Sequence, residues 1–300
     1  MRVRKVYKQM NTMQLPKEIE EIIRQRKQSF SANEINTLVS KGGYIANDEY
    51  ILYDALIALS LGKNVLLKGP TGSGKTKLAE TLSHHFQQPM QSVNCSVDMD
   101  AEALLGFKTI EEENGVNRIE FIPGPVIKAM EQGHLLYIDE INMAKPETLP
   151  ILNSILDYRR SLNNPFTSEM VQAKPTFGVI AAINEGYIGT VQLNEALKNR
   201  FVVIEIPYVQ NNTLRTVLKN ESKLKNPVLI DQFVQLSEDL IQQVSNGQVP
   251  EEAASIRALI DTCDLAVYLP PLRAIQRGIA DKLEEERERA AVMNIAATLF

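Results

Sequence analysis

A glycine-rich stretch near residue 70 constrains the fold of this chain more than any other feature. Residues 69–76 read Gly-Pro-Thr-Gly-Ser-Gly-Lys-Thr, which matches the phosphate-binding loop pattern G-x-x-x-x-G-K-[ST] at every fixed position. An apolar run at residues 65–67 precedes the loop and reads as a strand, and Leu78, Leu82 and Phe86 follow it at helical spacing. A strand, this loop and a helix in that order predict a nucleoside triphosphate site in an α/β fold.

The loop residues have predicted roles toward a triphosphate. Gly72 and Gly74 allow the backbone to curl around the anion, so that its N–H groups meet the negative charge. Lys75 would place its ammonium on the β- and γ-phosphates, and the hydroxyl of Thr76 would bind Mg²⁺. The helix that starts here points its positive end at the phosphates. The residues predicted to bind nucleotide are Gly69, Pro70, Thr71, Gly72, Ser73, Gly74, Lys75 and Thr76.

A second motif lies at residues 135–140, where the apolar run Leu-Leu-Tyr-Ile ends in Asp139 and Glu140. The length of the run suits a buried parallel strand. We predict that Asp139 helps to hold Mg²⁺ and that Glu140 is the base that orients the attacking water. An isolated Asp-Glu pair is more often a solvated strand end, and an isolated glycine-rich turn can match by chance. Together, in this order, the two motifs favour a nucleotide site.

Composition narrows the class of protein further. The chain has 300 residues, 44% of them hydrophobic, which is enough for a sizeable core in one large or two modest domains. Its net charge of -5 argues against nucleic acid as a partner. Cys95 and Cys263 lie too far apart to suggest a disulfide framework or a metal site. No apolar run approaches the roughly 20 residues that span a bilayer, and the basic start is not followed by a signal-peptide core, so we expect a cytoplasmic protein.

The pattern along the chain divides it into three predicted parts. Residues 1–43 form a polar arm with a helix over residues 16–27, whose Ile19, Ile22 and Ile23 could dock on a neighbour. Residues 44–210 alternate strands and helices, which predicts a parallel sheet covered on both faces. The strands are expected at residues 65–67, 90–94, 135–138, 176–183 and 202–206.

Residues 211–300 show only helical patterns and are predicted to form a small all-α domain. Pro270 and Pro271 are a start signal, which predicts a long amphipathic helix beyond them. The run at residues 281–289 reads as a solvated helical face that pairs Glu285 with Arg289. His84 and His85 point in different directions on a helix, so a metal site there is not expected.

Two insertions interrupt the α/β part. Residues 105–122 read as a hairpin, with strands at residues 107–110 and 118–122 around an Asn114-Gly115 turn. Residues 160–175 read as a second, more polar excursion. Insertions at the working edge of a sheet often contact a partner, although tolerated surface loops are as common.

Three polar residues extend the catalytic set. Asn184 ends an apolar run and could orient the attacking water or touch the γ-phosphate. Arg200 lies just before the last strand, and its guanidinium suits the equatorial oxygens of a phosphoryl group in transfer. Arg257 lies on a helix of the all-α part, where it could reach the phosphates. Taken singly, each has an ordinary alternative: a turn-forming Asn or a surface Arg.

The motifs in this order resemble those of AAA+ ATPases, and within that class the MoxR family. The resemblance covers nearly all of the chain from about residue 44. It rests on the phosphate-binding loop, residues 94–106, residues 121–125 with Ala129 and Gly133, Asp139-Glu140-Ile141-Asn142, Asn184, residues 193–201 and Ser255-Ile256-Arg257. It implies a P-loop NTPase core followed by a helical lid, with ATP and Mg²⁺ as ligands. No motif in the sequence distinguishes ATP from GTP, apart from the absence of the guanine signature Asn-Lys-x-Asp.

The resemblance also implies roles for single residues. Asn184 would be sensor 1, Arg257 sensor 2, and Arg200 the arginine finger that reaches into a neighbouring subunit of a hexameric ring. The two insertions would be the helix-2 hairpin and the pre-sensor-1 loop that such proteins present to partners. Family members commonly carry Asp before the finger, whereas Asn199 stands here, which leaves open what orients Arg200. Arg159 and Arg160 offer a rival finger or a second contact between subunits.

Three functional classes stay open at this point. The first is a remodelling chaperone that matures or activates a client enzyme, for instance by metal insertion, with a partner that carries a von Willebrand factor A domain. The resemblance there is to the subgroup that activates nitric oxide reductase or Rubisco. The second is a nucleic-acid motor or restriction-type NTPase, which the acidic composition disfavours. The third is a nucleotide-binding scaffold such as a gas-vesicle assembly factor, which would need neither Glu140 nor Arg200.

Overall fold

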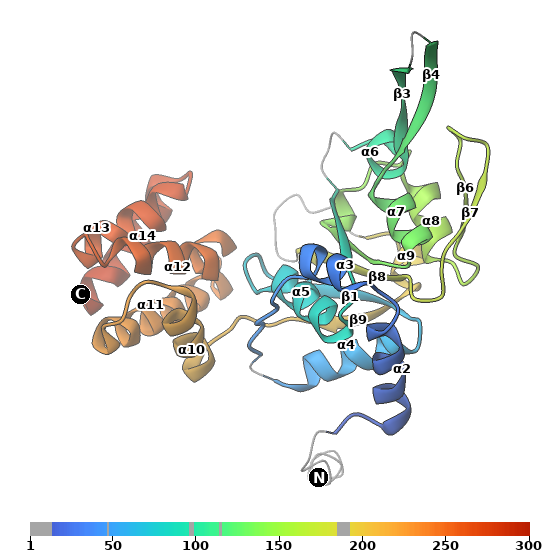
Figure 1. Ribbon diagram of the computed structural model, residues 1–300. Coiled ribbons are helices and arrows are strands. Elements are labelled where there is room, and N and C mark those ends of the chain that lie inside the picture. Colours follow the sequence, from blue (N-terminus) through green and yellow to red (C-terminus); the bar gives the residue numbers. More distant parts are fainter. Residues whose placement is uncertain (1–13, 47, 96–98, 114–115, 185–192) are drawn as a thin grey trace.

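A five-stranded parallel sheet in the order β2-β5-β8-β1-β9 forms the centre of the molecule (Figure 1). The computed structural model describes residues 14–46, 48–95, 99–113, 116–184 and 193–300. Every neighbouring pair of strands in this sheet is parallel. The α/β fold predicted from the sequence is therefore confirmed. The strands are β1 (Asn64–Gly69), β2 (Met90–Asn94), β5 (Leu135–Asp139), β8 (Gly178–Asn184) and β9 (Phe201–Glu205).

Helices cover both faces of the sheet, because alternate strand side chains enter two separate cores. Val65 and Leu67 pack with one set of helices, and Leu66 packs with the other. All three of these side chains are fully buried, which explains the uninterrupted apolar run. The first face carries α2 (Lys17–Lys27), α4 (Tyr50–Ser60) and α5 (Lys75–Phe86), and the second carries α6 (Ala101–Leu105), α7 (Pro125–Gln132) and α8 (Leu149–Leu156).

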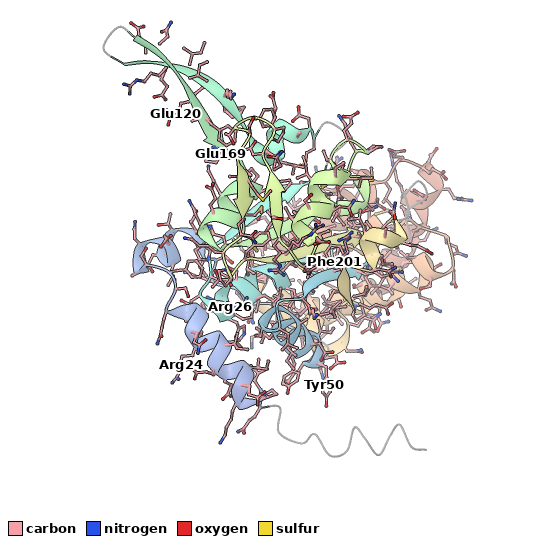
Figure 2. All side chains as sticks on the ribbon, turned by 90° about the vertical axis from the view of Figure 1, so that its right-hand side faces the viewer. Arg24, Arg26, Tyr50, Glu120, Glu169 and Phe201 are labelled. Atoms are coloured by element: carbon pink, nitrogen blue, oxygen red, sulfur yellow. The ribbon has the colours of Figure 1, made fainter. Side chains whose placement is uncertain are left out.

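Helix α2 packs against the sheet-covering helices of its own chain. Ile19 and Ile23 are buried in the same core as α4 and α5, so the neighbour on which they dock is this core. Arg26 is also buried, donates to the carbonyl oxygen of Leu59 at 2.7 Å and stacks 4.9 Å from the centre of the Phe86 ring. Burial lowers the pKa of Arg26 to about 10. Figure 2 shows Arg26 against the body of the protein, whereas Arg24 of the same helix lies outside. The short helix α3 (Ala32–Leu38) follows.

Two hairpins interrupt the α/β core. The first pairs β3 (Gly106–Glu113) with β4 (Val116–Pro123) and extends away from the sheet, as Figures 1 and 2 show. The predicted hairpin is confirmed with longer strands, and its Asn114-Gly115 turn lies outside the described residues. The second pairs β6 (Ser161–Asn163) with β7 (Met170–Gln172). These strands were not predicted, because three residues are too few to show an alternating pattern.

The C-terminal region is helical and has a hydrophobic core of its own. Leu214, Phe233 and Cys263 are completely buried in it. It follows the sheet after β9, and the short helix α9 (Glu195–Lys198) precedes that strand. Domain boundaries at residues 43 and 210 stay a prediction. The helices of this region are α10 (Asn211–Glu221), α11 (Pro227–Ser245), α12 (Ile256–Leu265), α13 (Pro271–Gly278) and α14 (Glu286–Leu299).

The long helix predicted after Pro270 is wrong. Helix α13 ends at Gly278, a 3₁₀ turn follows at Ala280–Lys282, and α14 begins only at Glu286. Gly278 packs so tightly on α12 that an added Cβ would lie 2.1 Å from the Thr262 hydroxyl oxygen. The predicted Glu285–Arg289 ion pair is also wrong: Arg289 donates instead to the carbonyl oxygens of Leu283 and Glu284, at 2.8 and 3.1 Å.

Candidate nucleotide-binding site

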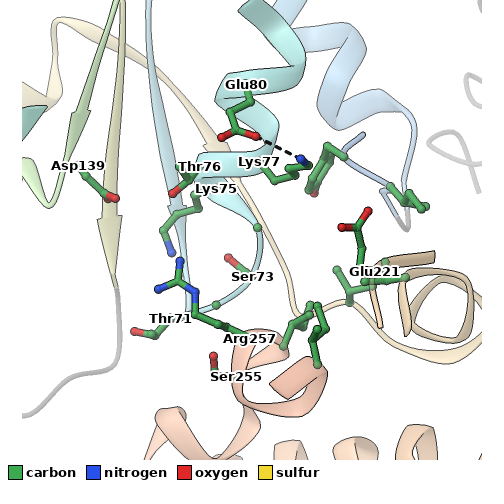
Figure 3. A pocket seen from close by; sticks show the side chains of 18 of the residues that line it. Thr71, Ser73, Lys75, Thr76, Lys77, Glu80, Asp139, Glu221, Ser255 and Arg257 are labelled. Carbon is green, nitrogen blue, oxygen red and sulfur yellow. Dashed lines mark hydrogen bonds and ion pairs between the residues drawn. The ribbon is translucent and has the colours of Figure 1, made fainter. Parts of the chain in front are cut away.

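The carboxyl ends of β1, β5 and β8 meet at one edge of the sheet and border a cavity of about 580 Å³ (Figure 3). Parallel strands bring their carboxyl ends together, and adjacent chain segments then diverge to opposite faces. Gly69 and Asn184 are register partners across β1 and β8, although they are far apart in sequence. The edge thus collects the phosphate-binding loop, the acidic pair after β5 and the amide that ends β8.

The phosphate-binding loop requires glycine at two positions. Gly72 has φ +75° and Gly74 has φ +91°, both in the left-handed region. A Cβ on Gly72 would lie 2.4 Å from the hydroxyl oxygen of Ser255, and one on Gly74 would lie 3.2 Å from the Tyr44 ring. The loop is therefore packed between the N-terminal segment and the C-terminal helical region. Helix α5 begins directly after it at Lys75.

Two hydrogen-bond donors of the loop, the Lys75 ammonium and the Ser73 hydroxyl, are buried and line the cavity, where they suit an anion. Lys75 is 6% exposed, and its Nζ donates to the carbonyl oxygens of Gly69 and Pro70, at 2.9 and 2.8 Å. Burial lowers the pKa of Lys75 to about 8, although Asp139, Glu251 and Glu140 oppose that shift. Gly69 and Pro70 supply these carbonyls and do not line the cavity, whereas residues 71–76 line it. The buried Ser73 hydroxyl has no hydrogen-bond partner within the described part of the chain, so the loop retains donor capacity for phosphate.

Two further residues of the cavity carry oxygen atoms of the kind that Mg²⁺ prefers. Thr76 lies in the first turn of α5 and Asp139 ends β5, and both line the cavity. A hydroxyl and a carboxylate are hard ligands, and Mg²⁺ in nucleotide sites takes few protein ligands beside phosphate and water. These residues therefore fit the ion. No cluster of three or more His, Cys, Asp or Glu side chains suited to a metal occurs among the described residues.

Glu140 also lines the cavity and is held there by its neighbours. Its backbone is left-handed, with φ 52°, which is uncommon for a residue with a side chain. The Glu140 N–H donates to Oδ1 of Asp139 at 3.1 Å, and Oε1 of Glu140 accepts from Nδ2 of Asn184 at 3.1 Å. A strained backbone that the surroundings stabilise is typical of active sites. Strand β8 therefore fixes the carboxylate that follows β5.

The C-terminal helical region closes the cavity from the other side. Arg257, near the start of α12, lines the cavity and points into it, as Lys75 does (Figure 3). The 3₁₀ turn Glu251–Ala254 lies beside the loop, and the Glu251 carboxylate accepts from the Thr71 N–H at 3.3 Å. The sheet and the helical region thus both contribute charged groups to one site.

Arg200 lies elsewhere. It directly precedes β9. Phe201, the first residue of β9, is the register partner of Asn64, the first residue of β1. The phosphate-binding loop lies at the other end of β1, after its last residue. The two ends of a six-residue strand are roughly 17 Å apart. Arg200 is consequently at the opposite edge of the sheet and does not line the cavity.

The carboxylate that contacts Arg200 is that of Asp157, from another element of the chain. Nη1 of Arg200 lies 3.2 Å from Oδ2 of Asp157, and Nε of Arg159 lies 3.0 Å from the other oxygen of that carboxylate. Hydrogen bonds from Arg159 and Arg200 hold the pKa of Asp157 below its usual range. Arg160 instead donates to the carbonyl oxygens of Gly62 and Phe177 inside its own chain. Of the two rival fingers, only Arg159 is exposed.

Several site residues escaped the sequence analysis. Tyr137, Asp157 and Glu251 each contact a predicted site residue, and the sequence analysis assigned a role to none of them. Tyr44 lines the cavity from a segment with no motif. The one available signal was Tyr137, a polar side chain in an otherwise apolar run two residues before Asp139.

Comparison with known proteins shows which class of protein this chain resembles. Residues 64–201 match the AAA domain of the dynein-related subfamily. The chain therefore contains a domain of this AAA family, and it belongs to the same protein family as the relative that follows. It is 64% identical to the uncharacterised protein YojN of Bacillus subtilis (strain 168) over 292 residues, which are 97% of this chain and 96% of YojN.

Further similarities extend over most of the chain. An uncharacterised protein of Staphylococcus saprophyticus is 62% identical over 86% of this chain and 98% of its own length. A crystal structure of a Cytophaga hutchinsonii protein is 16% identical, covers 94% of this chain and 97% of its own, and has a TM-score of 0.49. Among the described residues, no helix has both the length and the apolar character to cross a membrane.

Proposed function

We propose that this AAA protein hydrolyses ATP, with Glu140 as the base that activates water. The observation that carries the proposal is the 3.1 Å contact between Asn184 Nδ2 and Glu140 Oε1 in the cavity that also holds the phosphate-binding loop. The amide occupies one carboxylate oxygen and leaves the other available to accept a proton from water. A protein that only binds nucleotide needs no such arrangement, which disfavours the scaffold alternative.

The roles of the residues follow from their places in the cavity. Lys75, Arg257 and the loop N–H groups would bind the triphosphate charge, and Thr76 and Asp139 would hold Mg²⁺. When bound, Mg²⁺ neutralises charge on the β- and γ-oxygens. The water oxygen forms a bond to the γ-phosphorus as the bond to the β,γ-bridging oxygen breaks, and Glu140 accepts the proton of the water. The products are ADP and phosphate.

Arg200 would act in a second copy of the chain. At the opposite edge of the sheet it cannot serve the cavity of its own chain. Its side chain is about one third exposed and is oriented by Asp157. Repeated head-to-tail contacts that place one copy's Arg200 at the next copy's cavity form a ring when the rotation between copies closes. We take this ring to be a hexamer, by resemblance to the MoxR family.

The finer role is a remodelling chaperone of the MoxR type. The β3–β4 hairpin supports it, because Phe107, Ile110 and Ile119 are 50%, 68% and 72% exposed on an element that extends from the body. Exposed apolar side chains on a projecting element suit a protein partner. We propose a partner with a von Willebrand factor A domain and a client enzyme that is matured or activated, for instance by metal insertion. The net charge of -5 disfavours a nucleic-acid motor.

The substitution Glu140→Gln tests the proposal. It keeps an acceptor for Asn184 and removes the base, so ATP should still bind while turnover falls by about 10²- to 10⁴-fold. Glu147→Gln, at an exposed position outside the cavity, is the matched control and should keep both. Binding by isothermal titration and phosphate release are the measurements. Wild-type turnover in Glu140→Gln would remove Glu140 from the role of base.

A further inference from the structure

Tyr137 is a buried phenol in a strand whose other core residues are apolar. It is 3% exposed, and its neighbours Leu135, Leu136 and Ile138 are completely buried. An apolar side chain would satisfy the core at this position, so the hydroxyl calls for a separate explanation. Burying a hydroxyl is costly unless it is hydrogen-bonded.

The Tyr137 hydroxyl contacts one predicted magnesium ligand and comes from the strand that carries the other. Its oxygen lies 3.2 Å from Oγ1 of Thr76. Because side chains alternate along a strand, Tyr137 and Asp139 point to the same face of β5, and burial and the nearby Asp139 carboxylate raise the pKa of the phenol. The strand that ends in Asp139 thus also contacts the first turn of α5 through this hydroxyl.

A cation bound to Thr76 would set the direction of this hydrogen bond. A threonine oxygen that gives a lone pair to a cation keeps its one proton to donate. The phenol oxygen, 3.2 Å away, can accept that proton. This arrangement turns the Thr76 proton toward Tyr137 and leaves the lone pairs of the Thr76 oxygen available to a cation.

We propose that Tyr137 is a positioning residue of the magnesium site, which orients the Thr76 hydroxyl toward the ion. The inference rests on the proposed function only in requiring a magnesium–nucleotide complex in the cavity. Groups that orient metal ligands typically contribute about 10- to 100-fold to metal affinity. The contribution should therefore appear in the magnesium dependence of nucleotide binding.

Tyr137→Phe removes the hydroxyl and keeps the buried ring. The probe is a fluorescent, non-hydrolysable ATP analogue, titrated against the protein at increasing Mg²⁺ and also in EDTA. We expect the Mg²⁺ concentration at half-maximal effect to rise about 10- to 100-fold, while affinity in EDTA stays unchanged. Tyr268→Phe, at an exposed position 79% accessible in the C-terminal region, is the control and should match the wild type.

Three outcomes are informative. An unchanged magnesium midpoint in Tyr137→Phe, with a magnesium-dependent wild type, overturns this inference and leaves the proposed function intact. A wild type that does not bind the analogue overturns both. Partial unfolding of Tyr137→Phe would lower the amplitude of binding, so the magnesium midpoint of the protein that still binds decides between support and contradiction. As a second readout, Tyr137→Phe should have a smaller effect in a Thr76→Ala background, and fully additive effects would contradict a shared role.

Discussion

The amide nitrogen of Asn184 lies 3.1 Å from Oε1 of Glu140, which joins the ends of two neighbouring strands, β8 and β5, at the nucleotide cavity. The donor fixes which carboxylate oxygen faces the protein. The left-handed backbone of Glu140, with φ 52°, turns the chain at the same point. Backbone and side chain of Glu140 are thus both held by the fold, as a base with a defined direction requires.

Asn184→Asp should separate binding from turnover. The new carboxylate would face Glu140 and repel it instead of donating to it, so we expect turnover to fall by about 10²- to 10³-fold. The affinity for ATP should change by no more than about threefold, since the loop is untouched. Steady-state phosphate release and equilibrium binding test this. Asn163→Asp on β6, an exposed position outside the cavity, is the control; equal turnover in both variants would contradict the assignment.

The free energy of unfolding should depend on pH through Lys75. Burial lowers the pKa of Lys75 to about 8 from its ordinary 10.5. Between these values the unfolded chain binds the proton and the nucleotide-free folded chain does not, so the free energy of unfolding rises with pH. The variant Lys75→Met lacks the titrating ammonium, so its free energy of unfolding should not show this contribution. Urea unfolding at about pH 7.5 and about pH 10 should show wild type gaining relative to Lys75→Met; a difference that is independent of pH would refute it.

The contact between the loop and the C-terminal region is testable at Gly72. A Cβ there would meet the Ser255 hydroxyl at 2.4 Å, on a backbone with φ +75°. Gly72→Ala should lower the free energy of unfolding by about 1–3 kcal/mol and weaken ATP binding. Ser255→Gly in the same chain should recover part of the loss, because it removes the clash but not the backbone strain. No recovery at all would mean that Ser255 does not lie against the loop.

The Asp157–Arg200 pair predicts a graded effect on turnover. Asp157→Asn weakens one charge-assisted hydrogen bond to Arg200, and a loss of about 1.4 kcal/mol corresponds to about tenfold lower turnover. Arg200→Ala should cost about 10³- to 10⁵-fold. Asp231→Asn, which disrupts a comparable exposed pair with Arg215 in the C-terminal region, serves as the control. If Asp157→Asn and Asp231→Asn behave alike, Asp157 has no role in orienting Arg200.

Local patterns predicted the sheet and the loop, but not contacts between distant segments. The strands β1, β5 and β8 were visible because each is a buried apolar run, and α5 because Leu78, Leu82 and Phe86 share one face. The end of α13 was not visible, because the tight contact of Gly278 with Thr262 is a tertiary feature. The same holds for Asp157, which comes to Arg200 from a different element. Sequence periodicity indicates which residues are buried, but it does not indicate which polar side chains contact one another in the fold.

The most direct test of the account is ATP turnover per subunit as a function of protein concentration, with the mass of the assembly followed by light scattering. Arg200 lies at the opposite edge of the sheet from its own cavity, so the account predicts that turnover rises as copies assemble. It should collapse in assembled Arg200→Ala, and return in part when Arg200→Ala is mixed with Glu140→Gln, since each supplies what the other lacks. Turnover that is independent of assembly, or full activity of Arg200→Ala, would contradict hydrolysis at an interface between copies.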